Sequence, residues 1–145
     1  MNYEFIKRNS NNTFYPVTEN EINSMEKALN LRIPIELKKF FLEVGYGFIK
    51  GSENNVNRIM DPYSIRDFRL RENDYKYYPD IEIYEEFEVD KLIFFEGNET
   101  ALMSIELNES SNNPIYYYDI QIAGSLKDFL IAIEKDDKYY LELAD

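Results

Sequence analysis

The feature that most constrains the fold is a pair of helix signals within residues 18–47. Thr18 and Glu21 have the spacing of a capping box, in which each side chain satisfies a backbone N–H at the start of a helix. The apolar residues that follow recur at intervals of three and four and therefore share one helical face: Ile22, Met25 and Leu29. This spacing predicts an amphipathic helix that begins after Thr18.

A second helix signal follows a short extended link. Pro34 suits a first helical turn, where its missing N–H is not needed. An apolar stripe then repeats at helical spacing: Leu37, Phe40, Phe41 and Val44. Gly45 and Gly47 can take the left-handed conformation that ends helices. The two helices are expected to cover one hydrophobic core.

The second half of the chain is dominated by strand patterns. Four consecutive apolar residues, 92–95, are typical of a strand buried on both faces. A turn at Gly97-Asn98 and an alternating segment over 100–107 predict a hairpin with one wetter face. Residues 114–120 predict one further strand, and residues 81–84 alternate like an edge strand.

Other segments give weaker or later signals. Residues 56–60 are a plausible short strand, whereas residues 64–70 fit neither the helical nor the strand period. Ser125 is expected to cap a last helix, whose apolar face is formed by Leu126, Phe129, Leu130 and Ile133.

The order of these signals resembles the SUKH superfamily, which includes yeast cell-wall-synthesis regulators and many bacterial immunity proteins. The resemblance covers about residues 17–134 and consists of apolar and glycine positions rather than a catalytic signature. Ile33-Pro34 replaces the usual Leu-Pro step, and the turn over residues 96–99 lacks a second glycine. The matching segments are residues 22–29, 33–34, 37–42, 45–47, 92–105, 116–120 and 125–130.

The resemblance implies an α+β fold with a mixed, mostly antiparallel sheet and helices packed on one side. A length of 145 residues predicts a single domain spanning 1–145. No run approaches 18 apolar residues, and the first nine residues lack the apolar core of a signal peptide. We therefore expect a cytoplasmic protein that does not contact membranes.

The composition excludes several kinds of active site. The chain has no cysteine and no histidine, which rules out a Ser-His-Asp triad and zinc sites with nitrogen or sulfur ligands. It has no glycine-rich phosphate loop and no calcium-binding EF-hand spacing. We expect no enzymatic activity, no metal and no cofactor. A hydrolase that uses paired carboxylates is the least favoured alternative.

The charge is concentrated. The formal net charge is −12, and residues 72–90 hold 8 acidic side chains and 1 basic side chain. Such a surface repels nucleic acid and attracts basic partners. The alternative is that this acidity serves solubility alone.

Tyrosines lie among these acidic residues, and tyrosine is favoured in protein interfaces. The predicted partner-binding residues are Glu82, Glu85, Glu86, Glu88 and Asp90 as charge contacts, Tyr77, Tyr78 and Tyr84 as anchors, and Tyr116 and Tyr118 as second choices on one strand face.

The resemblance implies the kind of partner. Single-domain bacterial members of the superfamily are immunity proteins that bind and block a cognate toxin. We expect that toxin to be a nuclease with a basic cleft; the sequence makes no prediction about oligomeric state. The alternative is a non-enzymatic scaffold that resembles the fungal cell-wall regulators and binds signalling proteins.

Overall fold

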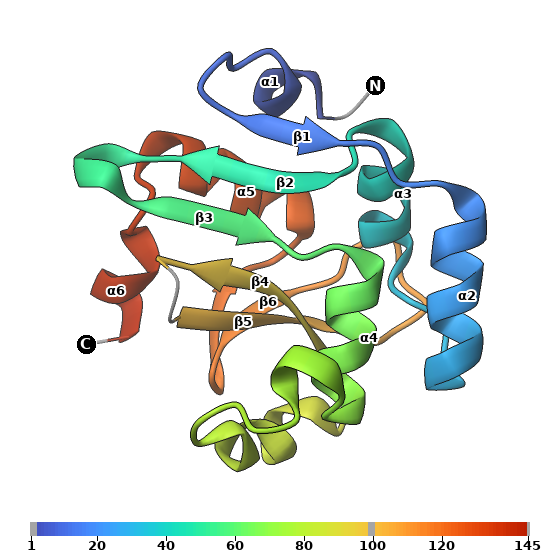
Figure 1. Cartoon of the computed structure of the whole chain (residues 1–145). Helices are drawn as coiled ribbons and strands as arrows, with labels where there is room; N and C mark the ends of the chain where they lie inside the picture. The colour runs from blue at the N-terminus through green and yellow to red at the C-terminus, as the bar shows by residue number, and fades with distance from the viewer. Residues whose placement is uncertain (1–2, 99–100, 145) are drawn as a thin grey trace.

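The computed structural model describes residues 3–98 and 101–144, and these form one sheet with helices around it (Figure 1). Seven strands follow one another in sequence order, each antiparallel to its neighbours. The α+β prediction is confirmed, but the described sheet is antiparallel throughout and its helices lie on both faces rather than on one side. The strands are β1 (Thr13–Tyr15), β2 (Tyr46–Lys50), β3 (Val56–Ile59), β4 (Lys91–Gly97), β5 (Ala101–Glu106), β6 (Ile115–Tyr117) and β7 (Ile120–Ala123).

The helices lie between and after these strands. Within the described part of the chain, no helix has the length and apolar character needed to span a membrane. The α-helices are α1 (Glu4–Lys7), α2 (Glu19–Leu29), α3 (Ile35–Glu43), α4 (Pro62–Leu70), α5 (Leu126–Lys135) and α6 (Tyr139–Ala144). Three 3₁₀ segments complete the fold: η1 (Ser52–Asn54), η2 (Asn73–Tyr75) and η3 (Ile81–Glu88).

The predicted capping box is present at the start of α2. The Thr18 hydroxyl accepts from the Glu21 N–H at 3.1 Å, and the Glu21 carboxylate accepts from the Thr18 N–H at 2.9 Å. Ile22 and Met25 are buried, as their spacing predicts. The apolar faces of α3 and α5 are also buried, so all three predicted helices are confirmed.

Gly45 ends α3 as predicted, whereas Gly47 belongs to β2. The Gly45 N–H donates to the Phe40 carbonyl oxygen at 3.2 Å, and the two glycines have φ of 115° and 154°. A Cβ atom on Gly45 would lie 1.9 Å from the carbonyl oxygen of Tyr15, and one on Gly47 would lie 2.1 Å from that of Thr13. These positions are glycine because β1 passes directly against them.

Two segments differ from their predicted strands. Residues 81–84 belong to η3 and not to an edge strand. Residues 114–120 are split into β6 and β7 by a tight turn at Tyr118, whose φ is 56°. The ambiguous residues 64–70 belong to α4, which begins where the Asp61 carboxylate accepts from the Ser64 N–H at 3.3 Å.

The β4–β5 hairpin is buried on both faces, so the predicted wetter face of β5 is wrong. Residues 101–105 are all buried, Ser104 included. Since alternate residues point to opposite faces, both sides of β5 must be covered. Figure 1 shows α5 behind the sheet and α4 in front of it, beside β4. The turn residues Glu99 and Thr100 lie outside the described residues.

Candidate partner-binding surface

Residues 72–90 form a lobe beside α4, which we call the acidic lobe. Two arginines at the end of α4 hold it against the sheet. Arg69 donates to the carbonyl oxygens of Lys91 and Glu88, at 2.8 and 3.0 Å. Arg71, in left-handed conformation at the helix end, donates to the Phe68 carbonyl at 2.7 Å. The lobe therefore has a fixed position although it contains no strand.

Glu88 fastens the lobe to the fold and does not face solvent. Both of its carboxylate oxygens accept from Arg71, at 2.6 and 3.3 Å, and its side chain is buried. A bidentate pair of this kind is strong and geometrically specific. A partner can reach Glu88 only if this pair breaks, so we remove Glu88 from the predicted charge contacts.

Tyr84 is also buried, against the prediction that it is an exposed anchor. Its ring stacks on that of Tyr118 at 6.0 Å and meets Phe68 edge-on at 5.9 Å. Burial, followed by the hydrogen bond with Tyr118, raises the pKa of the Tyr84 hydroxyl. The structure thus uses Tyr84 and Tyr118 to pack the lobe against the β6–β7 turn.

Two predicted tyrosines of the lobe remain accessible. The Tyr77 side chain is 86% exposed, and Lys76 lies 5.5 Å from its ring. Tyr78 is half-buried, because its ring packs against Tyr75 and Phe68. Tyr77 is thus the most accessible aromatic anchor among the predicted residues.

Tyr116 and Tyr118 do not share a strand face, because the turn separates them. The Tyr116 ring lies on β6, 4.7 Å from the Lys91 ammonium, and its hydroxyl donates to Glu106 at 3.4 Å. Tyr118 turns toward Tyr84. The predicted pairing of these two tyrosines as one surface is wrong.

Four predicted acidic residues are exposed: Glu82, Glu85, Glu86 and Asp90. Asp90 pairs with Lys91 at 2.9 Å, and this hydrogen bond lowers the pKa of its carboxyl. Among the ion pairs of the described residues, none involves the other three. Their negative charge is therefore directed into solvent without a fixed countercharge.

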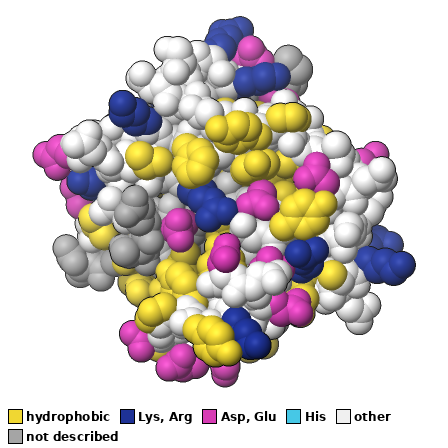
Figure 2. Space-filling view, viewed as in Figure 1, with side chains coloured by type: hydrophobic (Ala, Val, Ile, Leu, Met, Phe, Trp, Pro, Cys, Tyr) yellow, Lys and Arg dark blue, Asp and Glu magenta, His cyan; other side chains and the backbone are white. Residues whose placement is uncertain are grey.

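A second surface lies on the outer face of β1, β2 and β3, and the sequence did not point to it. A hollow of about 590 Å³ is lined there by Tyr15, Tyr46, Phe48, Val56, Arg58, Asp61 and Glu96. We call it the aromatic face. Figure 2 shows hydrophobic side chains gathered over these strands, with acidic side chains below them. The alternation of side chains along β2 could have indicated this surface, because Tyr46, Phe48 and Lys50 share one side of the strand.

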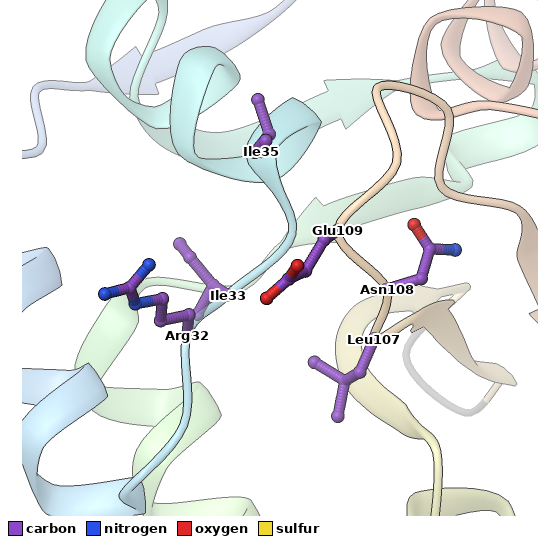
Figure 3. Close-up of a pocket in the computed structure, with 6 residues that line it drawn as sticks. All are labelled: Arg32, Ile33, Ile35, Leu107, Asn108 and Glu109. Atoms are coloured by element: carbon purple, nitrogen blue, oxygen red, sulfur yellow. The ribbon is translucent and has the colours of Figure 1, made fainter.

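A third hollow, of about 550 Å³, lies between the α2–α3 link and the loop after β5 (Figure 3). Its apolar part comes from Ile33, Ile35 and Leu107, and its charged groups are Arg32 and Glu109. It holds none of the predicted contacts. With one carboxylate among its lining residues, it does not supply the facing pair that glycoside hydrolysis requires.

The described part of the chain contains no group of three aspartate or glutamate side chains that could hold a metal ion. The pKa values of the Asp90 and Asp137 carboxyl groups both lie below the ordinary value for aspartate. A general acid needs a raised pKa, so neither residue suits that role.

Comparison with known proteins adds two matches. The model of the SMI1-KNR4 cell-wall family, one of the SUKH families, matches residues 19–130. A protein of Bacillus subtilis (strain 168), named immunity protein YxxD, is 69% identical over 145 residues, which cover 100% of this chain and 99% of that protein. No solved structure matches the chain.

Proposed function

The chain belongs to the SUKH family of SMI1-KNR4 cell-wall proteins, and from this membership we propose that it is an immunity protein. It binds a cognate polymorphic toxin in the cytoplasm and neutralises it without a reaction of its own. The observation that carries the proposal is full-length similarity to a protein named as an immunity protein. At 69% identity over nearly all of both chains, the two proteins share their fold.

The acidic lobe supports a basic partner. Its exposed carboxylates, among them Glu82, Glu85 and Glu86, lie on a lobe that is anchored to α4 through hydrogen bonds to Glu88. Complementary charge speeds the encounter of two proteins and excludes partners of the same sign. We propose that these residues and Asp90 are charge contacts, with Tyr77, Tyr78 and Tyr116 as neighbouring aromatic contacts.

We propose further that the toxin is a nuclease. A nuclease binds nucleic acid through positive groups that neutralise phosphates. An acidic lobe that occupies such a cleft excludes the substrate by presenting carboxylates where phosphates bind. This mechanism requires stoichiometric binding and no catalytic residue in the immunity protein.

The exposed carboxylates provide a direct test. We take the product of the neighbouring gene as the candidate toxin and expect Glu85→Lys/Glu86→Lys to slow association with it by about tenfold at low salt. The dissociation rate should change much less, since these side chains are exposed at the rim. Surface plasmon resonance at low and high ionic strength measures both rates.

The matched control is Glu109→Lys/Glu142→Lys, which makes the same change in net charge at exposed positions outside the lobe. It should leave the association rate within about twofold of the wild-type rate. Equal rates and equal salt dependence for the two double variants would contradict a role for the acidic lobe.

A second candidate function is a regulatory scaffold that binds signalling proteins. The description of the matching family model, which refers to the cell wall, favours it. The full-length similarity to a bacterial immunity protein favours the first candidate more strongly. A scaffold would bind its partners without suppressing a toxin's activity.

A further inference from the structure

We propose that the aromatic face of β1–β3 is the apolar centre of the toxin interface, and that the acidic lobe forms its charged rim. This inference rests on the proposed immunity function and assigns that function a second surface. The occupant is the surface of the cognate toxin domain that presents an apolar or aromatic side chain flanked by lysine or arginine.

The first argument is that this half of the sheet is covered on one side only. In β2, Gly47 and Ile49 are buried on the inner side, while Tyr15 of β1 and Phe48 are 45% and 38% exposed on the outer side. The outer side of β4–β5 is covered by α4 and η3, but that cover does not extend over β1 and β2. Large aromatic side chains left open in a hollow are typical of a protein interaction site.

The second argument is that the aromatic residues lie on the same side of neighbouring strands and that two of their rings pack together. Tyr15 pairs with Tyr46 across the β1–β2 ladder, and their rings are 5.4 Å apart. Phe48 lies opposite Arg58 in the β2–β3 ladder, and Arg58 lies opposite Glu96 in the β3–β4 ladder. Rings that are fixed before binding lose little conformational freedom when a partner covers them.

The third argument is continuity with the acidic lobe. Arg58 donates to Asp61 and Ser64, at 3.0 and 2.8 Å. Tyr75 of the lobe lies close to this guanidinium, whose charge opposes the rise in the pKa of the Tyr75 hydroxyl that burial causes. The same end of the hollow contains Glu96. Arg58 therefore lies between the aromatic face and the acidic lobe, and Figure 2 shows acidic side chains below the hydrophobic ones on this side of the molecule.

The negative charge around the hollow favours a basic partner. The hollow has two carboxylates and one guanidinium, and that guanidinium is already paired with Asp61. Beyond it lie the exposed carboxylates of the lobe, with Lys76 as the one basic residue of residues 72–90. A basic partner with a protruding apolar side chain matches both regions, because cations also bind favourably over aromatic rings.

Truncation of the aromatic side chains tests the proposal in binding measurements with the product of the neighbouring gene, the candidate toxin. Tyr15→Ala and Phe48→Ala should each weaken binding at least tenfold, through faster dissociation and with an unchanged salt dependence. Reversal of charge in the lobe should instead slow association, so the two surfaces have different kinetic signatures. Phe48→Gln serves as a second variant if Phe48→Ala unfolds.

The matched control is Leu42→Ala, which truncates a side chain that is 49% exposed on α3 and lines a different hollow. It should bind within about twofold of wild type. The proposal is overturned if Tyr15→Ala and Phe48→Ala bind as Leu42→Ala does. It is also overturned if wild type is a dimer that Phe48→Ala converts to a monomer, because a second copy then covers the face. Wild-type protein that does not bind the toxin domain would instead refute the proposed function itself.

Discussion

Gly45→Ala is expected to lower the free energy of unfolding by at least about 3 kcal/mol. The backbone at Gly45 has a φ of 115°, which side-chain-bearing residues rarely adopt. The added Cβ would also lie 1.9 Å from the carbonyl oxygen of Tyr15, a backbone atom that cannot rotate away. The clash is relieved only if β1 moves off β2, which breaks the ladder and displaces the aromatic face.

Thermal unfolding followed by circular dichroism measures this effect. For a chain of this size we expect a fall in Tm of roughly 6–12 °C. Gly124→Ala is the matched control, because a Cβ there meets nothing within 4 Å. It should leave the Tm nearly unchanged. Equal Tm values for the two variants would contradict the close approach of β1 to Gly45.

The second large effect is expected for Glu36→Ala, which should lower the free energy of unfolding by about 2–4 kcal/mol. Glu36 lies in the first turn of α3 and is only 8% exposed. Its carboxylate accepts from the backbone N–H groups of Asn113 and Leu126, at 2.6 and 3.2 Å, and from that of Lys127 at 3.5 Å. One side chain thus joins α3 to the loop before β6 and to the start of α5. Its loss leaves buried N–H groups without partners.

Urea denaturation measures this change as a shift in midpoint at constant slope. Glu36→Gln should be intermediate, since its amide retains one acceptor oxygen but loses the charge. Glu109→Ala removes an exposed carboxylate and should change stability by less than about 0.5 kcal/mol. If Glu36→Ala were as stable as Glu109→Ala, the carboxylate would not join these elements.

Helices α2, α3 and α5 were predictable because their signals are local. A capping box at Thr18 and an apolar stripe on α5 are each contained in one segment, and both are present in the structure. The long β4 strand was predictable for the same reason, since its four apolar residues are adjacent. Local patterns thus account for the elements that form the centre of the core.

The errors arose where distant parts of the chain decide the local structure. Residues 81–84 alternate like a strand, but Arg71 and Phe68 hold this segment as η3 through Glu88 and Tyr84. The β6–β7 turn places Tyr118 in left-handed conformation, where tyrosine is unusual. Its ring is held by Tyr84 and Phe87 of the lobe. No local pattern contains this information.

The charge of the candidate site was predictable from the sequence, but which of its side chains are buried was not. The sequence locates the acidic run, yet it cannot distinguish Glu88, which pairs with Arg71, from its exposed neighbour Glu86. The aromatic face escaped detection because its residues come from distant segments of the chain. Tyr15 lies opposite Tyr46 only when β1 and β2 pair.

The most direct test of the central claim is an inhibition assay. The chain is co-expressed with the product of the neighbouring gene, and any complex is purified through a tag on one partner. The nuclease activity of that product is then measured with and without an equimolar amount of this protein. The account predicts a one-to-one complex in which the nuclease activity of the toxin is suppressed. The absence of a complex, or a complex in which the toxin stays active, would contradict it.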